Sequence, residues 1–303
     1  MNVLLCGDID ATELASWRAA LAAAMPEASW LDPADAHEQP TAVVAAVVAN
    51  PHPGSLRRFP NLQLIQSLWA GVDRLLADRT LPPNVRIARM VDPAMTAAMA
   101  ETALWAVLSL HRGFFDYARQ QREGRWLQRP QRRTDEVQVL VLGRGEMGLA
   151  TASRLAEQGY QVQSWSRRSS AATPLSDLLP RAEIVINLLP LTDATRGLLD
   201  SRFFCALPRG AALVNLARGA HVVEPDLLAA LDSGALRHAV LDVFATEPLA
   251  TGHRFWQHPA VTVLPHAAAM TDARSAASVV AANLRALRNG TPLSHLVDRA
   301  RGY

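Results

Sequence analysis

Short apolar runs alternate with helix-like stretches along almost the whole chain. In the first hundred residues, the pattern predicts a helix over 11–25 and strands over 3–6, 42–48, 62–68 and 85–88. A second series of apolar runs predicts a helix over 149–158 and strands over 137–142, 160–165, 184–189, 211–216, 238–243 and 261–264. Apolar runs of this length are typical of buried parallel strands. The alternation therefore predicts an α/β fold with two α/β units.

Three further segments connect or follow these units. Residues 93–117 have helical apolar spacing and are long enough to cross from one domain to another, whereas residues 119–133 read as an arginine-rich, solvated arm or linker. A last helix over 270–289 is expected to return to the first unit, which has no other obvious C-terminal partner. We therefore expect one domain of residues 1–97 with 270–303 and a second of residues 98–269.

Three polar residues, Arg218, Glu247 and His266, each end an apolar run. Ligands of doubly wound sheets bind outside the carboxyl ends of the strands, so the three side chains should converge on one crevice. A guanidinium can grip a carboxylate with two hydrogen bonds, and an imidazole backed by a carboxylate can move a proton. Singly, these residues could be a surface arginine, a loop carboxylate and a structural histidine. Together they suit the binding of a 2-oxo or 2-hydroxy acid.

A glycine motif lies between the strand over 137–142 and the helix that follows it. It consists of Gly143, Arg144, Gly145, Glu146, Met147 and Gly148. Gly143 suits a tight turn, Gly145 lets the backbone approach a pyrophosphate, and Gly148 lets the helix pack on the sheet. The helix N-terminus adds free N–H groups and partial positive charge. The motif therefore predicts a dinucleotide site, with a glycine-rich turn that binds nothing as the alternative.

The end of the next strand indicates which dinucleotide is bound. An NAD enzyme places a carboxylate there, but this chain has Ser166, Arg167 and Arg168. Arginines suit a 2′-phosphate, which favours NADPH, although two surface arginines would look the same. Asp242 either receives the nicotinamide amide or caps a turn. The remaining predicted cofactor contacts, each of which could equally be an ordinary turn residue, are Leu189, Pro190, Thr195 and Ala217.

Composition excludes several other classes of protein. The chain has 303 residues and a net charge of +2, without the basic stripe that a nucleic-acid binder needs. It contains no lysine, which excludes Schiff-base and P-loop lysine chemistry. Its histidines lack metal-ligand spacing, and no apolar run reaches the ~18 residues of a membrane span. Cys6 and Cys205 stand in apolar contexts, so we expect buried free thiols and a cytoplasmic location. Residues 1–8 have no basic start and too short an apolar run for a signal peptide, so we expect none.

Several motifs together resemble the D-2-hydroxyacid dehydrogenase family. They are the glycine motif, the run from Asn215 to Gly219, the run from Leu241 to Pro248, and Pro265 with His266. The resemblance covers essentially the whole chain and is closest to the glyoxylate/hydroxypyruvate reductase A branch. It implies two Rossmann-like, doubly wound domains with a cleft between them, a substrate domain and an NADP-binding domain, and a homodimer.

The resemblance also implies an activity, the NADPH-dependent reduction of glyoxylate and hydroxypyruvate. In that reaction Arg218 would hold the substrate carboxylate and polarise the carbonyl, and His266 would give its proton to the developing alkoxide. Glu247 would keep His266 charged. The substrate is a small 2-oxoacid, and no metal, nucleic acid or membrane is implied.

The chain departs from the family where it reads Trp69, Ala70 and Gly71, because the family usually has a small residue in place of the tryptophan. By resemblance, the backbone amides of this loop cradle the substrate carboxylate. Trp69 either lines or narrows the substrate pocket or points into the core. Two alternatives therefore stay open: a reductase of bulkier or aromatic 2-oxoacids, and a cofactor-sensing binding protein without enzymatic activity.

Overall fold

The computed structural model describes residues 1–167 and 173–303 and divides the chain into two compact units. Unit 1 comprises Met1–Met95 and Thr271–Tyr303, and unit 2 comprises Thr96–Met270. These bounds differ by no more than two residues from the expected domain limits. Both units are α/β structures with parallel sheets, so the expected fold class is confirmed.

Unit 1 contains a five-stranded parallel sheet in the order β2-β1-β3-β4-β5. Its strands are β1 (Asn2–Gly7), β2 (Ser29–Leu31), β3 (Val43–Ala49), β4 (Leu64–Ser67) and β5 (Arg86–Ala88). Its helices are α1 (Ala11–Ala24), α2 (Pro33–Glu38), α3 (Asp73–Leu76) and α10 (Ala273–Asn289). Six of the seven residues of β3 are buried, as both faces of a parallel sheet are covered in such folds.

The apolar pattern did not predict β2 and α2. β2 is only three residues long and lies at the sheet edge, so its period is too short to recognise. α2 is polar and starts through local chemistry: the Asp32 carboxylate accepts the N–H groups of Ala34 and Asp35 at 2.9 and 3.0 Å. This N-cap takes up two of the N–H groups that begin a helix without partners.

The last helix, α10, returns to unit 1, as expected. It packs against α1, and its Arg285 donates hydrogen bonds to the Glu27 carboxylate at 2.9 Å and the Ala24 carbonyl at 2.7 Å. It begins at Ala273 rather than at residue 270, because Asp272 caps it by accepting the N–H of Arg274.

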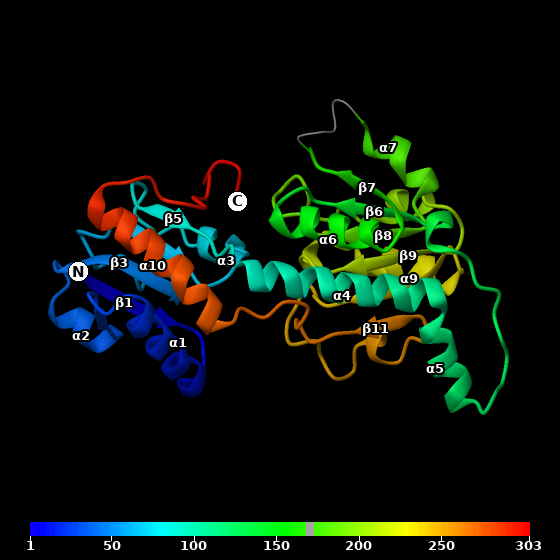
Figure 1. Ribbon diagram of the computed structural model, residues 1–303, viewed down its shortest axis with the longest axis horizontal. Helices are drawn as coiled ribbons and strands as arrows, with labels where there is room; N and C mark the ends of the chain where they lie inside the picture. Colours follow the sequence, from blue (N-terminus) through cyan, green and yellow to red (C-terminus); the bar gives the residue numbers. More distant parts are fainter. Residues whose placement is uncertain (168–172) are drawn as a thin grey trace. The chain divides into compact units, whose positions relative to one another are not determined.

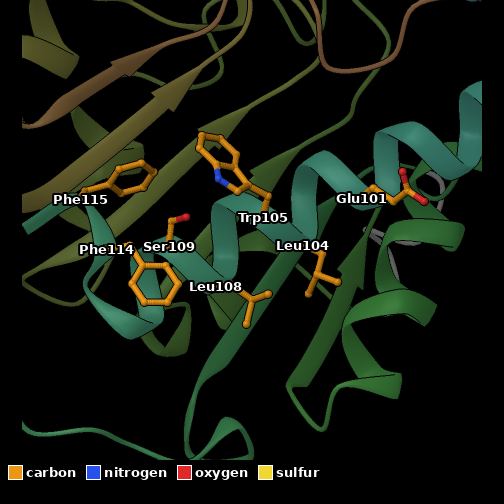
Figure 2. Close-up of a pocket in the computed structure, with 7 residues that line it drawn as sticks. All are labelled: Glu101, Leu104, Trp105, Leu108, Ser109, Phe114 and Phe115. Carbon is orange, nitrogen blue, oxygen red and sulfur yellow. The ribbon is translucent and has the colours of Figure 1, made fainter. Parts of the chain in front are cut away.

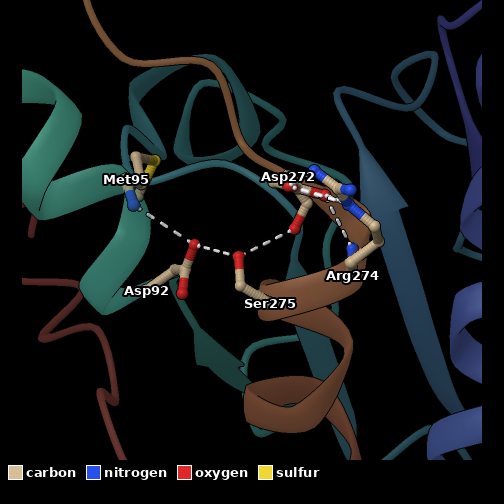
Figure 3. A network of polar contacts seen from close by, with 5 residues as sticks. All are labelled: Asp92, Met95, Asp272, Arg274 and Ser275. Atoms are coloured by element: carbon tan, nitrogen blue, oxygen red, sulfur yellow. Dashed lines mark hydrogen bonds and ion pairs between the residues drawn. The ribbon is translucent and has the colours of Figure 1, made fainter.

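Asp92 joins the two segments through which the chain passes between the units. Its buried carboxylate accepts the N–H of Met95 at 3.3 Å and the hydroxyl of Ser275 at 2.7 Å (Figure 3). The beginnings of α4 (Pro93–Arg112) and α10 are therefore tied to each other within unit 1.

Unit 2 contains a six-stranded parallel sheet in the order β11-β10-β9-β8-β6-β7 (Figure 1). Its strands are β6 (Gln138–Leu142), β7 (Gln161–Trp165), β8 (Ile184–Asn187), β9 (Ala211–Asn215), β10 (Leu236–Leu241) and β11 (Val261–Val263). Its helices are α4 (Pro93–Arg112), α5 (Phe114–Arg122), α6 (Glu146–Glu157), α7 (Leu175–Leu178), α8 (Ser201–Cys205) and α9 (Glu224–Asp232). The chain passes from β6 to its neighbour β7 and then to β8 on the other side of β6, so the topological switch point lies between β6 and β8.

The sheet of unit 2 is covered on both faces, because successive residues of a strand point to opposite sides. Val139 and Val141 of β6 pack with residues of α4 such as Ala103 and Val107. Leu140 and Leu142 belong to the other apolar cluster, which contains residues of α8 and α9. The polar residues that follow the strands are therefore confined to the sheet's ends.

The helix expected over 93–117 is two helices. Gly113 adopts φ +74°, a left-handed conformation that ends α4 at Arg112 and starts α5 at Phe114. Apolar spacing did not reveal the break, because both helices keep apolar residues at helical intervals. The exposed arm consequently begins after Arg122 and not at residue 119.

By length and composition, α4 is the one helix within residues 1–167 and 173–303 that could cross a membrane. It has 20 residues, and its mean hydropathy reaches 1.2. The core helix of a globular domain passes the same test, and Ala103, Ala106 and Val107 of α4 are fully buried against the sheet.

The two cysteines are less buried than expected, because Cys6 is half-buried and Cys205 is exposed. Both thiols are free, as predicted. Burial raises the pKa of Cys6 to about 12, which keeps this thiol protonated and unreactive. Cys205 is exposed rather than buried, because the buried side of α8 is formed by its neighbours Phe203 and Phe204.

Candidate active site

Three neighbouring strands, β9, β10 and β11, bring the predicted site residues to one edge of the sheet. The Asp242 N–H, just after β10, donates to the Asn215 carbonyl at 3.0 Å, and the His266 N–H donates to the Asp242 carbonyl at 2.9 Å. Arg218 follows β9 three residues beyond Asn215. The segments that carry Arg218 and His266 are therefore joined through hydrogen bonds at the carboxyl ends of the strands, where ligands of this architecture bind.

Glu247 and His266 are in direct contact. One Glu247 carboxylate oxygen lies 2.7 Å from Nδ1 of His266, and the other accepts the N–H of Phe244 at 2.9 Å. The His266 and Glu247 side chains are 52% and 36% exposed, so the pair can be reached from solvent. Because the carboxylate only accepts, Nδ1 carries the proton in this contact. Nε2 is then the ring nitrogen that can exchange a proton with a bound molecule.

The backbone at His266 has an uncommon conformation. Its φ is +55°, a left-handed value that costs a non-glycine residue free energy and occurs most often at functional sites. Asp242 stabilises the turn, since its carboxylate accepts the N–H groups of Ala267 at 2.7 Å and Ala268 at 3.1 Å. Of the two roles considered for Asp242, the structure shows this turn-capping one.

Asp242 holds its turn from inside the protein, with 1% of its surface exposed. Burial raises the pKa of its carboxyl, and the nearby Glu247 carboxylate adds to this effect. The N–H groups of Ala267 and Ala268 and the charge of His266 oppose it.

Arg218 lies in a tight turn, half-buried, and its Nη1 donates to the carbonyl of Ala217 at 2.7 Å. The next residue must be glycine, because a Cβ on Gly219 would lie 1.9 Å from the carbonyl carbon of Phe244. The Arg218 turn therefore packs directly on the backbone that leads to Glu247. This close approach places Arg218 beside the segment that carries the carboxylate of the pair.

A buried polar network behind Arg218 was not predicted. Asn187 and Asn215 occupy paired positions at the ends of β8 and β9, and the Asn187 amide donates to Oδ1 of Asn215 at 2.9 Å. Asn215 in turn donates to the Arg218 carbonyl at 3.0 Å, and His221 touches the same carbonyl. The sequence did hold a signal for Asn187: a polar residue at the end of the apolar strand over 184–186.

The glycine motif forms a turn into which a diphosphate fits. Gly143 has φ +120°, and a Cβ on it would lie 2.6 Å from the carbonyl oxygen of Leu188. A Cβ on Gly148 would lie 2.1 Å from the Gly143 carbonyl oxygen, so both positions require glycine. A Cβ on Gly145 would meet no described residue within 4 Å, which leaves the backbone open to a ligand. Gly145 also precedes α6, whose first N–H groups suit an anion.

The other predicted cofactor residues belong to the motif itself or to the loops that follow β7, β8 and β9. Arg167, after β7, is exposed and donates to the Ala194 carbonyl at 3.0 Å, beside Thr195. Thr195 is buried and donates to the Pro190 carbonyl at 2.8 Å. Arg168 lies outside the described residues. The remaining members are Arg144, Glu146 and Pro190, which are exposed, Met147 and Ser166, which are half-buried, and Leu189 and Ala217, which are buried.

The loop with Trp69, Ala70 and Gly71 follows β4 in unit 1, and all three residues are half-buried. The loop is held by Ser67, whose hydroxyl accepts the Trp69 N–H at 3.0 Å, and by Met90, which donates to the Trp69 carbonyl at 3.1 Å. Trp69 is thus not a fully buried core residue.

Comparison with known proteins decides the family. The model of the D-isomer specific 2-hydroxyacid dehydrogenases, NAD binding domain, matches residues 104–268. The glyoxylate/hydroxypyruvate reductase A of Serratia proteamaculans is 38% identical over 304 residues, which cover 95% of this chain and 96% of that protein. The chain belongs to the D-isomer specific 2-hydroxyacid dehydrogenase family. The resemblance noted in the sequence is therefore confirmed.

Solved structures support this family assignment over the full length of the chain. A family member from Xanthobacter autotrophicus, in complex with NADPH and MES, has a TM-score of 0.92 and 37% identity, with 100% of this chain and 99% of that chain covered. An NADPH-dependent glyoxylate/hydroxypyruvate reductase from Sinorhizobium meliloti, in complex with NADP and sulfate, has a TM-score of 0.90 and 32% identity, with the same coverage.

Proposed function

We propose that this dehydrogenase reduces small 2-oxoacids, glyoxylate and hydroxypyruvate among them, to 2-hydroxyacids with NADPH. The observation that carries the proposal is the 2.7 Å contact between Glu247 and His266, at the same edge of the sheet as Arg218 and the glycine turn. The relatives named glyoxylate/hydroxypyruvate reductases support the substrate class. Relatives in complex with NADPH and NADP support the cofactor.

Each residue of the site then has one task. Bound NADPH supplies the hydride that reduces C2 of the oxoacid. The Arg218 guanidinium pairs with the substrate carboxylate and polarises the C2 carbonyl. Nε2 of His266 gives a proton to the C2 oxygen, so that one hydride and one proton convert the ketone or aldehyde to an alcohol. Glu247 holds Nδ1 of His266 and stabilises the protonated ring.

A panel of 2-oxoacids tests the proposed activity. Purified protein with NADPH is expected to turn over glyoxylate and hydroxypyruvate with a higher kcat/KM than phenylpyruvate, which represents the bulkier substrates suggested by Trp69. A preference for phenylpyruvate would support that alternative. NADPH binding without turnover of any oxoacid would instead favour a cofactor-sensing protein.

We also propose that Arg167 contributes to a preference for NADPH over NADH. An exposed guanidinium at the end of β7 can pair with a 2′-phosphate, whereas NADH presents only a hydroxyl. Arg167→Asp is expected to lower kcat/KM for NADPH by about 10- to 100-fold, the worth of a hydrogen bond to a charged group. The ratio of the kcat/KM values should move toward NADH.

The matched control for this prediction is Arg181→Asp. Arg181 is exposed in the same unit, but it precedes β8 and so lies at the opposite end of the strands. Arg181→Asp makes the same charge change as Arg167→Asp and should leave the preference for NADPH unchanged. A wild-type enzyme that prefers NADH would refute the role of Arg167.

We propose, finally, that two copies associate through α4, α5 and the arm. Figure 2 shows the apolar side chains of Trp105, Leu108, Phe114 and Phe115 around a groove of about 440 Å³. Nearby in sequence, the arm presents Trp126, which is 95% exposed. Exposed apolar side chains that gather in this way can mark protein interfaces.

The association can be measured by light scattering coupled to size exclusion. Wild type is expected to have twice the chain mass, and Trp105→Arg to shift the protein toward the monomer, because it places a charge in the apolar groove. The control Trp256→Arg alters another half-exposed tryptophan, outside the groove, and should leave the mass unchanged. A monomeric wild type would contradict the proposal.

A further inference from the structure

A buried histidine, His221, links the turns that follow β8 and β9. It is 0% exposed and ends the short 3₁₀ helix Gly219–His221, directly after Arg218. Its Nδ1 lies 3.1 Å from the Arg218 carbonyl oxygen, and its Nε2 lies 3.3 Å from the Pro190 carbonyl oxygen. One ring therefore contacts the turn of the predicted substrate arginine and the turn of a predicted cofactor residue.

The surrounding groups show what each ring nitrogen of His221 can do. Oδ1 of Asn187 accepts the Leu189 N–H at 3.2 Å, so its amide nitrogen is the atom that faces Nδ1 of His221 at 3.0 Å. Nδ1 also faces the Arg218 carbonyl, an acceptor, at 3.1 Å, so it can accept from Asn187 or donate to Arg218 but cannot do both. The Pro190 carbonyl can only accept, so Nε2 donates to it and carries a proton in either case.

Each half of this arrangement supports a different part of the site. On one side, His221 holds the Asn187 amide, which also donates to Asn215, and Asn215 donates to the Arg218 carbonyl. On the other side, the Pro190 carbonyl receives two hydrogen bonds, from His221 and from Thr195 at 2.8 Å. The Pro190 turn follows the end of β8. The glycine turn packs at the same place, because Gly143 lies against the Leu188 carbonyl.

We infer that His221 is a positioning residue for the reduction, which sets the Arg218 backbone through the two asparagines and the Pro190 turn through Nε2. This inference rests on the proposed function, because it assumes that Arg218 binds the substrate carboxylate. His221 meets the two turns through different ring nitrogens, so the loss of one contact should displace one turn more than the other.

Two amide variants separate the two halves of the network. In His221→Asn, the side-chain oxygen can take the place of Nδ1 and accept from Asn187, but the bond to Pro190 is lost. In His221→Gln, the longer amide can donate to Pro190, but the Nδ1 contacts with Asn187 and the Arg218 carbonyl are lost. His221→Asn should therefore raise the KM for NADPH by about 3- to 10-fold, the effect of one net hydrogen bond, and leave the KM for glyoxylate within about twofold. His221→Gln should instead raise the KM for glyoxylate by about 3- to 10-fold and leave the KM for NADPH within about twofold.

His238 provides the matched control. It is also a largely buried histidine of unit 2, on β10, and its Nε2 contacts the Thr262 hydroxyl at 2.9 Å. Burial lowers its pKa to about 4, so it is neutral near pH 7. His238→Gln should lower the Tm but change neither KM. Fluorescence titration with NADPH measures a Kd in the absence of turnover, and this Kd reports the effect of the contact between His221 and Pro190.

The outcomes distinguish the inference from the proposed function. Opposite KM changes in the two His221 variants, with a raised NADPH Kd only in His221→Asn, support the positioning role. Variants that lower the Tm but behave like the His238 control in both KM values overturn it, while a wild type that reduces glyoxylate upholds the function. A wild type that binds NADPH but reduces no oxoacid overturns the proposed function and, with it, the inference.

Discussion

Replacing His266 with alanine is expected to lower kcat by about 10²–10⁴, the usual contribution of a general acid. The ring is oriented by its 2.7 Å contact with Glu247, which directs the proton transfer to Nε2. Alanine removes the proton donor but touches neither Arg218 nor the glycine turn. The KM for NADPH should therefore stay close to that of the wild type in steady-state measurements with glyoxylate.

Glu247→Gln provides a companion test of the same pair. Glutamine can keep a hydrogen bond to the imidazole but lacks the negative charge, so the protonated ring loses a charge-assisted bond. The kcat for glyoxylate reduction should fall about 10-fold, because the neutral amide bond to the proton-donating ring is weaker than the charge-assisted one. His266→Ala with near-normal turnover would refute the acid role, and an unchanged kcat in Glu247→Gln would show that the Glu247 charge does not support the proton transfer.

Arg218→Ala is expected to raise the KM for the oxoacid and also to lower kcat. The guanidinium is assigned two tasks, binding the carboxylate and polarising the carbonyl, so its loss should affect both constants. Two hydrogen bonds to a charged group correspond to a fall in kcat/KM of about 10²–10⁴. Steady-state kinetics with glyoxylate at fixed, saturating NADPH measure the effect.

Lysine should not rescue this position. Arg218→Lys keeps the positive charge but replaces the planar fork with a point charge, so most of the kcat/KM loss should remain. Arg202→Ala, an exposed arginine on α8, removes a guanidinium from the same unit and should leave both constants unchanged. An unchanged glyoxylate KM in Arg218→Ala would contradict the assignment of the carboxylate to this residue.

The period of the apolar residues was sufficient to predict the strands of unit 2 and their parallel arrangement. Strands such as β8 and β9 are apolar on both faces, so they stand out as continuous runs. The split between α4 and α5 was not predictable in this way, since it depends on the left-handed conformation of Gly113 and not on hydrophobicity. Edge elements such as β2 were also not predicted, because three residues carry no recognisable period.

For the site, the strand-end rule was sufficient to group Arg218, Glu247 and His266, but it could not supply their contacts. One oxygen of Glu247 accepts the N–H of Phe244, and this contact directs the other oxygen to Nδ1 of His266. The network of Asn187 and His221 was missed because a buried polar residue has meaning only once its partners are known. Sequence spacing does not report such long-range pairs.

The most direct measurement of the central claim is the product formed from hydroxypyruvate. Wild-type protein with NADPH is incubated with hydroxypyruvate, and the glycerate is resolved by chiral chromatography while NADPH oxidation is followed by absorbance. The account predicts one molecule of glycerate for each NADPH oxidised, and loss of this product in His266→Ala. Membership of the D-isomer specific family predicts that the product is D-glycerate. Formation of L-glycerate, or consumption of NADPH that His266→Ala leaves unchanged, would contradict it.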